Sequence, residues 1–192
     1  ATFLAWVWFT NLYNFMDGID GIAGTEALTI TLGAALVAWM SGHAVDILNP
    51  ALVIAGAVIG FLVWNWHPAR IFMGDVGSIS LGFVLGWILL ALAADGEWAA
   101  AAILPAYYLA DATITLGRRI LRGEKFWRAH KEHFYQRAHQ AGLSHSQVVL
   151  RIAFANVCLI GLAAWASQGN AIAAVAGAVI VVGILLRHLA SP

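Results

Sequence analysis

Residues 11–24 read Asn-Leu-Tyr-Asn-Phe-Met-Asp-Gly-Ile-Asp-Gly-Ile-Ala-Gly and lie between two strongly apolar segments. The stretch carries two amides and two carboxylates, Asn11, Asn14, Asp17 and Asp20. The glycines between them allow the backbone to approach a ligand or a metal closely. An interfacial turn whose polar side chains only cap helix ends would use the same residue types. Polar groups at this density beside membrane segments instead favour a functional loop. An EF-hand is excluded, because aliphatic residues occupy the third and twelfth positions counted from Asp17.

The composition is that of an integral membrane protein. Charged residues make up 10% of the 192 residues and hydrophobic residues 61%, whereas soluble domains are about 25% charged. The mean hydropathy is +0.81. The one cysteine, Cys158, lies in an apolar run, where it forms no internal disulfide and is expected to pack. We therefore expect an all-α polytopic membrane protein with a single membrane domain over residues 1–192.

Seven apolar segments predict the membrane helices, since a crossing takes about 20 apolar residues. The chain opens on the end of one helix, Ala1–Phe15, so we expect it to be the C-terminal part of a longer protein. Turn sequences such as Asn49-Pro50 separate the other segments. Six complete crossings are predicted at Glu26–Ser41, Pro50–Trp66, Ile79–Ala94, Trp98–Leu116, Gln147–Ser167 and Asn170–Leu189.

The charges are distributed unevenly between the two sides of the predicted bundle. Alternating crossings place the segments 11–24, 67–78 and 117–146 on one side, with all ten Lys and Arg residues on or near it. The other side carries only the acidic residues Asp46, Asp95 and Glu97. By the positive-inside rule, the basic side faces the cytoplasm.

A second glycine-rich cluster, Phe-Met-Gly-Asp-Val-Gly-Ser at 72–78, precedes the apolar segment that begins near Ile79. A helix N-terminus offers free N–H groups and a partial positive charge, which suits a phosphate. Asp75 is a hard oxygen ligand of the kind that Mg²⁺ takes together with water and substrate phosphates. Ser78 is equally well explained as the N-cap of that helix. Phe72 either packs at the interface or stacks on a flat base.

The third polar element lies in the long basic loop, where residues 128–137 read Arg-Ala-His-Lys-Glu-His-Phe-Tyr-Gln-Arg. In a helix, His130, His133 and Arg137 would line one face. Residues 118–137 include seven basic and two acidic residues, which would also suit a patch that meets anionic lipid headgroups. The histidines favour a more specific role, although a zinc site here lacks a third soft ligand nearby.

The remaining polar groups have open interpretations. Asp111 either pairs with Arg118 or Arg119 or forms a polar wall of the site, and the roles of His139 and His145 are unassigned. Together, the three polar elements place carboxylates, a helix N-terminus and His/Arg donors on one membrane face. This combination suits phosphoryl transfer, in which positioning and charge neutralisation supply most of the catalysis. One substrate would be a lipid phosphate and the other a soluble anion, and we expect no nucleic-acid partner.

The motifs at 11–21, 72–78 and 130–137 resemble, in register, those of the polyprenyl-phosphate N-acetylhexosamine-1-phosphate transferases. That family includes the translocase that makes the first lipid intermediate of peptidoglycan and the enzymes that initiate O-antigen and teichoic-acid synthesis. The resemblance implies transfer of a sugar 1-phosphate from a UDP-N-acetylhexosamine to undecaprenyl phosphate, with release of UMP. It also implies a multi-pass protein of the bacterial cytoplasmic membrane that contacts membrane lipid, and it is compatible with a homodimer.

The resemblance further implies roles for individual residues, with Mg²⁺, or Mn²⁺ in its place, as the cofactor. By resemblance, Asp75 is the metal-ligand aspartate, Asn14 and Asp17 contact the nucleotide-sugar near its diphosphate, and His130, His133 and Arg137 hold phosphate. We therefore expect Asp75, Asp17, His130 and His133 to be catalytic, with Asp75 and Asp17 as the metal ligands. The substrate-binding positions are Asn11, Asn14, Gly18, Asp20, Phe72, Gly74, Ser78 and Arg137. Among them, Gly18 and Asp20 resemble the wall that reads uracil, and Phe72 resembles the ring that stacks on it.

The chain departs from the family pattern in two ways. Its spaced His-x-x-His resembles the O-antigen and capsule initiators more than the peptidoglycan translocase, which favours a UDP-N-acetylglucosamine-like or deoxy-N-acetylhexosamine donor. Transfer of phospho-N-acetylmuramoyl-pentapeptide is the alternative. The family's paired aspartates on an earlier loop are absent, so we expect these 192 residues alone to be inactive.

Two other classes of protein are alternatives, namely a cation transporter and a non-catalytic membrane scaffold. A transporter is disfavoured because its binding groups would lie near the middle of the membrane, whereas these carboxylates lie at segment ends. A scaffold is disfavoured because it would leave the two Asp-Gly clusters unexplained.

Overall fold

The computed structural model describes residues 2–42, 44–124 and 131–191, and in this part of the chain it contains helices and no strand. The predicted all-α class is thereby confirmed. The α-helices are α1 (Thr2–Phe15), α2 (Ile22–Ser41), α3 (Ala44–Asn65), α4 (Gly74–Ala94), α5 (Trp98–Ile103), α6 (Ala106–Leu121), α7 (Phe134–Gln140), α8 (His145–Trp165) and α9 (Ala171–Ala190).

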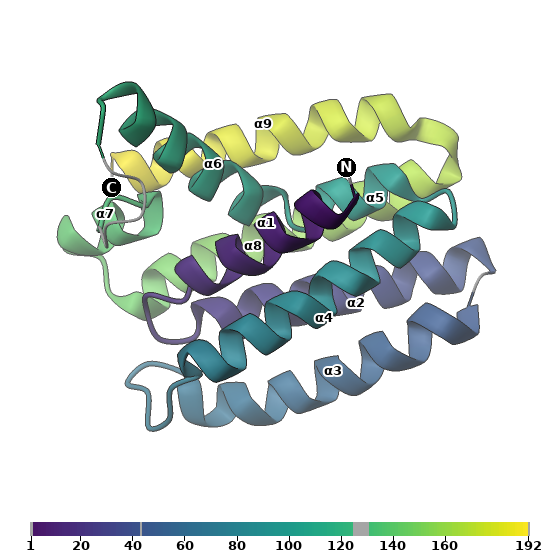
Figure 1. The fold of residues 1–192 in the computed structure, drawn as a ribbon, viewed down its shortest axis with the longest axis horizontal. Helices are drawn as coiled ribbons and strands as arrows, with labels where there is room; N and C mark the ends of the chain where they lie inside the picture. The colour runs from purple at the N-terminus through teal and green to yellow at the C-terminus, as the bar shows by residue number, and fades with distance from the viewer. Residues whose placement is uncertain (1, 43, 125–130, 192) are drawn as a thin grey trace.

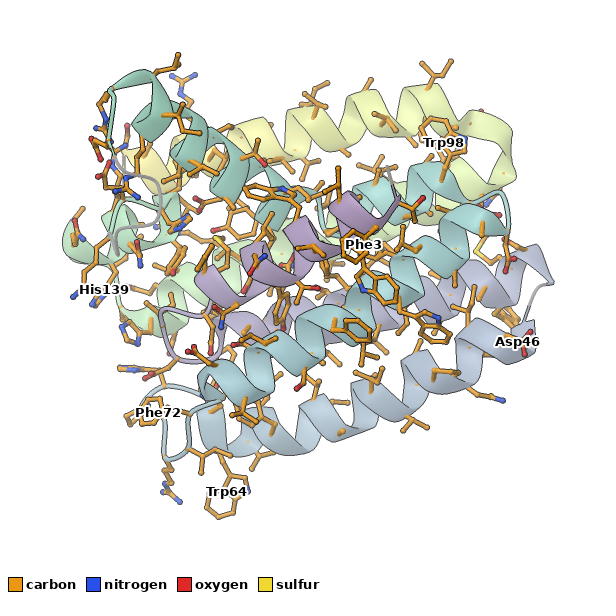
Figure 2. The ribbon with its side chains drawn as sticks, viewed as in Figure 1. Phe3, Asp46, Trp64, Phe72, Trp98 and His139 are labelled. Atoms are coloured by element: carbon orange, nitrogen blue, oxygen red, sulfur yellow. The ribbon has the colours of Figure 1, made fainter. Side chains whose placement is uncertain are left out.

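The long helices lie side by side, and their connections gather at two opposite ends of the molecule (Figure 1). One end, called the α7 end below, holds the α1–α2 turn, the α3–α4 loop, α7 and the end of α9. The opposite end holds the α2–α3, α4–α5 and α8–α9 connections. The described Lys and Arg residues lie in or next to the segments at the α7 end, whereas Asp46 lies at the opposite end (Figure 2). The predicted segregation of charge therefore holds for the described residues.

Four stretches are long and apolar enough to cross a membrane, Ile22–Ser41, Asp46–Asn65, Gly74–Ala94 and His145–Ala190. The last stretch is a hairpin of α8 and α9, because Gly169 adopts a φ of 91° at the junction and reverses the chain. The helices α2, α3 and α4 begin before their predicted starts. The prediction of a turn at Asn49-Pro50 is wrong, since Pro50 lies within α3. Proline is tolerated in membrane helices where neighbouring groups satisfy the freed carbonyl.

The predicted fifth crossing, Trp98–Leu116, is not one helix. It is divided into α5 and α6 at Leu104-Pro105, and α6 continues past the predicted end to Leu121. Pro105 has no N–H to donate, and its ring crowds the preceding turn, so a helix breaks there. The axis of α6 leaves the direction of α5 at this point and leads toward the α7 end (Figure 1).

The helix α2 forms the centre of the bundle, because 78% of the residues in its most apolar stretch are buried, against 22% for the corresponding stretch of α3. It packs on α3, α4 and α8. A buried hydrogen bond of 2.7 Å from the Asn156 amide to the Glu26 carboxyl joins α2 to α8. By contrast, α3 and α9 expose apolar side chains such as Val53 and Ile172 along their outer faces, as lipid-facing helices do. The α1–α2 turn at the α7 end thus directly precedes the most buried of the membrane-spanning stretches.

Candidate functional site

The α1–α2 turn is held in place by the end of α3. Gly21 adopts a φ of 80°, a left-handed conformation that side chains disfavour. Its N–H donates to the Asn65 side-chain oxygen at 2.9 Å, and the Asn65 amide donates to the carbonyl of Ile71 at 2.8 Å. A Cβ on Gly21 would also approach the Trp66 ring to 3.4 Å. One asparagine therefore connects the first glycine-rich motif to the loop that precedes the second.

Asn14, at the end of α1, joins the first two motifs directly. Its amide nitrogen donates to Oδ1 of Asp75 at 3.1 Å and to the hydroxyl of Ser78 at 2.8 Å. The Ser78 hydroxyl in turn donates to the carbonyl of Gly74 at 3.0 Å. The interpretation of Ser78 as an N-cap is wrong, because α4 already begins at Gly74 and Ser78 lies buried in its second turn. Instead, Ser78 and Asp75 both accept hydrogen bonds from the Asn14 amide. These two contacts hold the Asp75 carboxylate in one orientation.

A cavity of about 260 Å³ opens beside this contact at the α7 end. It is lined by Asn14, Asp17, Gly18, Ile19, Asp20, Asn65, Phe72, Met73, Gly74, Asp75, Ser78 and His145. Burial, and then the negative charge of Asp75, raise the pKa of Asp17 from 3.8 to about 6. A cation placed between the two carboxylates would stabilise the ionised form of Asp17. The cavity therefore suits a divalent metal ion.

The third motif is anchored by Asp111 of α6, which is fully buried. Its carboxylate accepts hydrogen bonds from Nδ1 of His133 at 3.0 Å and from the backbone N–H of Phe134 at 3.1 Å. Among the described residues, the ion pair of Asp111 is with His133 and not with the arginines proposed for it. Arg119 pairs with Glu124 at 2.9 Å, and the Arg118 guanidinium lies 5.0 Å from the centroid of the Phe134 ring. The contact orients the His133 imidazole and holds the start of α7 against α6.

The third motif also contacts the first. A Cβ on Gly18 would overlap the Tyr135 hydroxyl and come within 3.2 Å of the Gln136 amide, so only glycine fits there without a shift. The Tyr135 ring stacks on His133, with ring centroids 5.7 Å apart and an angle of 18° between the planes. Burial, followed by the charges of Asp111 and Asp17, raises the pKa of Tyr135. The three predicted motifs therefore converge at the α7 end, and Asn14 and Gly18 are where they meet.

A second polar cluster was missed by the sequence analysis. Asp20 Oδ2 lies 2.6 Å from Nδ1 of His67 and 3.2 Å from Nδ1 of His145, and it accepts the N–H of Ala69 at 3.2 Å. Burial acts to raise the pKa of Asp20, but the hydrogen bonds from His67, Ala69 and His145 outweigh it and hold the pKa below its ordinary value. The only signal in the sequence was the presence of unassigned histidines, because residues 20, 67 and 145 are far apart along the chain.

The other predicted site residues are less closely involved. Asn11 lies exposed on α1, where its amide donates to the carbonyl of Val7 at 3.0 Å, and it does not line the cavity. Phe72 lines the cavity edge with 75% of its surface exposed, and it projects at the α7 end in Figure 2. Arg137 is exposed on α7. His130 lies outside the described residues.

These features define a class: a helical membrane protein with a polar cavity at the end of its spans, in which carboxylates, an amide and a helix N-terminus can hold a metal and a phosphate. The glycosyl transferase family 4 model matches residues 1–93. The chain belongs to this family.

Curated relatives agree with that assignment. The chain is 36% identical over 147 residues to a probable undecaprenyl-phosphate N-acetylglucosaminyl 1-phosphate transferase of Bacillus subtilis, covering 74% of this chain and 41% of the relative. It is 37% identical over 134 residues to a phospho-N-acetylmuramoyl-pentapeptide-transferase of Streptococcus thermophilus, covering 62% and 38%. It is 34% identical over 168 residues to a putative glycosyltransferase of Streptomyces coelicolor, covering 84% and 40%. The chain thus spans about 40% of the length of these relatives.

Proposed function

We propose that the complete protein transfers N-acetylhexosamine 1-phosphate from a UDP-sugar to undecaprenyl phosphate, releases UMP and so starts the synthesis of a cell-envelope glycan such as an O-antigen or capsule. The observation that carries the proposal is the contact of Asn14 with Asp75 and Ser78. It joins two motifs around one cavity at the end of the membrane spans, where a lipid phosphate and a soluble nucleotide can both arrive. The names of the relatives from Bacillus subtilis and Streptococcus thermophilus support this reaction class.

Asp17 and Asp75 are the residues that would hold Mg²⁺, or Mn²⁺ in its place. The raised pKa of Asp17 supports this assignment. Burial and the negative charge of Asp75 disfavour the ionised form of Asp17, and a bound cation would offset both effects. When bound, the ion supplies charge neutralisation for the diphosphate. Asn14 keeps the Asp75 carboxylate in one orientation through its hydrogen bond. Gly74 and Ser78 bring the N-terminus of α4 to the same cavity, which adds backbone N–H groups for a phosphate oxygen.

Other residues of the cavity, together with residues of the third motif that do not line it, would bind the two substrates. We assign the uridine to the end formed by Gly18, Asp20 and Phe72, since an exposed aromatic ring at a cavity edge can stack on a base. His133, oriented by Asp111, and Arg137 would contact phosphate oxygens. We retain His130 in this set and Asn11 at its border on the resemblance of their motifs alone.

The assay that tests the proposal uses the complete protein in lipid nanodiscs with undecaprenyl phosphate and a divalent cation. We expect UMP release with UDP-N-acetylglucosamine or a deoxy-N-acetylhexosamine analogue to exceed release with UDP-N-acetylmuramoyl-pentapeptide by at least tenfold. An Asp46→Asn variant, altered at the opposite end, should retain the activity. Absence of transfer from every UDP-N-acetylhexosamine would refute the proposal, and a preference for the pentapeptide donor would reassign the substrate.

We also propose that the α7 end faces the cytoplasm in the bacterial inner membrane. The described basic residues gather at this end, and such residues are retained on the cytoplasmic side. A cation transporter fits less well, because its binding groups would lie near the middle of the membrane, whereas this cavity lies at the ends of α1 and α4. Labelling of single cysteines placed at Arg137 and at Asp46, each in a Cys158→Ala background, from either side of sealed vesicles distinguishes the orientations.

A further inference from the structure

We propose that Asp20, His67 and His145 form a binding site for a transition-metal ion, with Zn²⁺ as the expected ion, separate from the Asp17–Asp75 pair. The three side chains come from three distant parts of the chain: the α1–α2 turn, the α3–α4 loop and the first residue of α8. One ligand atom from each lies within 4.8 Å of the other two. Loops from separate elements thus present two imidazole nitrogens and one carboxylate oxygen to a common point.

The spacing of these atoms suits a small ion. Ligand atoms around a tetrahedral zinc ion lie roughly 3.3 Å apart, since Zn–N and Zn–O bonds are about 2.0–2.2 Å. The distance from Asp20 Oδ2 to Nδ1 of His145 is already 3.2 Å. The distance from Asp20 Oδ2 to Nδ1 of His67 is 2.6 Å, so the His67 ring has to move outward. Its side chain is 39% exposed, which leaves room for that movement.

The ligand types select the class of metal. Two imidazole nitrogens and one carboxylate oxygen suit zinc, cobalt, nickel or copper, whereas Mg²⁺ takes oxygen ligands almost exclusively. The Asp17–Asp75 pair offers only oxygen atoms, so the two sites would select different ions from the same solution. Three protein ligands leave a fourth position open. Asp20 and His145 line the cavity, so an ion held by them would lie beside it.

A neighbouring histidine supports the site from outside. The His139 ring lies edge-on to His145, with ring centroids 4.4 Å apart. Its Nδ1 is 2.9 Å from the carbonyl of Leu143, and since a carbonyl only accepts, this nitrogen carries the proton. His139 thus adds a third imidazole beside the group and restricts how the His145 ring can turn.

An ion at this site would tie the α1–α2 turn to the α3–α4 loop and to α8. It would also occupy the end of the cavity that we assign to uridine, so that Zn²⁺ and the UDP-sugar would compete. That consequence, unlike the site itself, depends on the proposed function. The alternative is a purely hydrogen-bonded clamp without an ion, in which the Asp20 carboxylate accepts from His67 and Ala69 and the Asp20 N–H donates to Nδ1 of His145 at 3.3 Å.

The test is a Zn²⁺ titration of the complete, tag-free protein in detergent, by calorimetry without nucleotide and with Mg²⁺ in excess to fill the oxygen site. We expect one Zn²⁺ per chain, and Co²⁺ in its place should give the visible absorption of a four-coordinate ion. His145→Ala and His67→Asn should each weaken Zn²⁺ binding about 100-fold or more. His188→Ala, in the last turn of α9, should not change it.

His67→Asn is the decisive variant, because asparagine can still donate a hydrogen bond to Asp20 and so preserves a clamp while removing the imidazole. Weakened Zn²⁺ binding in this variant, at unchanged thermal stability, supports the metal site. Absence of Zn²⁺ binding to the unmodified protein would overturn it, and so would Zn²⁺ binding in His67→Asn and His145→Ala equal to that of the unmodified protein. None of these outcomes depends on transferase activity.

Discussion

Asp75 and Asp111 are both carboxylates at the α7 end, yet their surroundings are opposite. Asp75 is exposed at the cavity, and the one hydrogen bond described for its carboxylate comes from the Asn14 amide. Asp111 is fully buried, and its two oxygens accept from five donors. These donors are the hydroxyls of Tyr107 and Thr115, Nδ1 of His133, and the backbone N–H groups of Phe134 and Tyr135.

The difference indicates that Asp75 is available to bind a ligand, whereas Asp111 supports the structure of the site. A carboxylate offers about four lone-pair positions, so the five donors around Asp111 leave no capacity for a ligand. Asp75 keeps most of its capacity and faces the same cavity as Asp17. We infer that Asp75 acts on the substrate complex, and that Asp111 acts only through His133 and α7. This contrast predicts different responses of activity and stability when each carboxylate is removed.

The largest effect on activity is expected from Asp75→Asn. The substitution keeps the size of the side chain but removes the negative charge that would hold the metal. Transfer by the complete protein should fall about 100-fold or more, with the midpoint of thermal unfolding unchanged or slightly raised. Initial rates of UMP release and a melting curve in the same detergent measure both quantities. A rate within threefold of the unmodified protein would show that Asp75 is not a ligand.

Asp111→Asn should lower the stability more, and the activity less, than Asp75→Asn does. The amide nitrogen would face donors that now meet carboxylate oxygen, and removing one partner of a buried charged contact costs about 3–5 kcal/mol. We expect a lower unfolding temperature and faster proteolysis near α7, together with a smaller loss of activity than in Asp75→Asn. Limited trypsin digestion, with cleavage at Arg137 followed by mass spectrometry, reports the loosening. Normal stability with lost activity would place Asp111 among the substrate contacts instead.

The sequence was sufficient for the parts of the site that lie within one motif. Glycines beside carboxylates at 17–21 and 72–78 predicted a close approach, and the uneven distribution of basic residues predicted that both motifs share one end. The structure brings them together through Asn14, which had been assigned to the substrate rather than to Asp75 and Ser78. The residue was thus identified, while its partners were not.

Contacts between distant segments could not be derived from spacing. Asp111 and His133 meet only because α6 bends away after α5 and brings its middle to α7. Pro105 was the visible sign of that break, but the apolar residues around it fit a continuous crossing equally well. Asp20, His67 and His145 illustrate the same limit, since their approach depends on α1 and α3 ending, and α8 beginning, at the same end of the bundle (Figure 1).

A third prediction uses pH to test the coupling of Asp17 to Asp75. Because the pKa of Asp17 is raised to about 6, its carboxylate is protonated below that pH and ionised above it. A proton therefore competes with the metal, and Mg²⁺ affinity should fall about tenfold per pH unit below pH 6. Calorimetric Mg²⁺ titrations between pH 5 and pH 8 measure the profile. In Asp17→Asn the affinity should be lower and lose this step, whereas equal affinity at pH 5 and pH 7 in the unmodified protein would contradict the assignment.

The smallest effect is expected at the contact between the first and third motifs. Gly18→Ala places a methyl group against the Tyr135 hydroxyl, and overpacking of this kind costs about 1–3 kcal/mol. Because the strain falls on α7, we expect activity to drop by roughly tenfold, less than for Asp75→Asn. Tyr135→Phe removes the oxygen atom that the added methyl group would meet, so the double variant should recover most of the loss. A double-mutant cycle on activity and melting temperature measures this coupling. Additive losses would show that Gly18 acts on the substrate directly and that α7 does not need to pack against the α1–α2 turn.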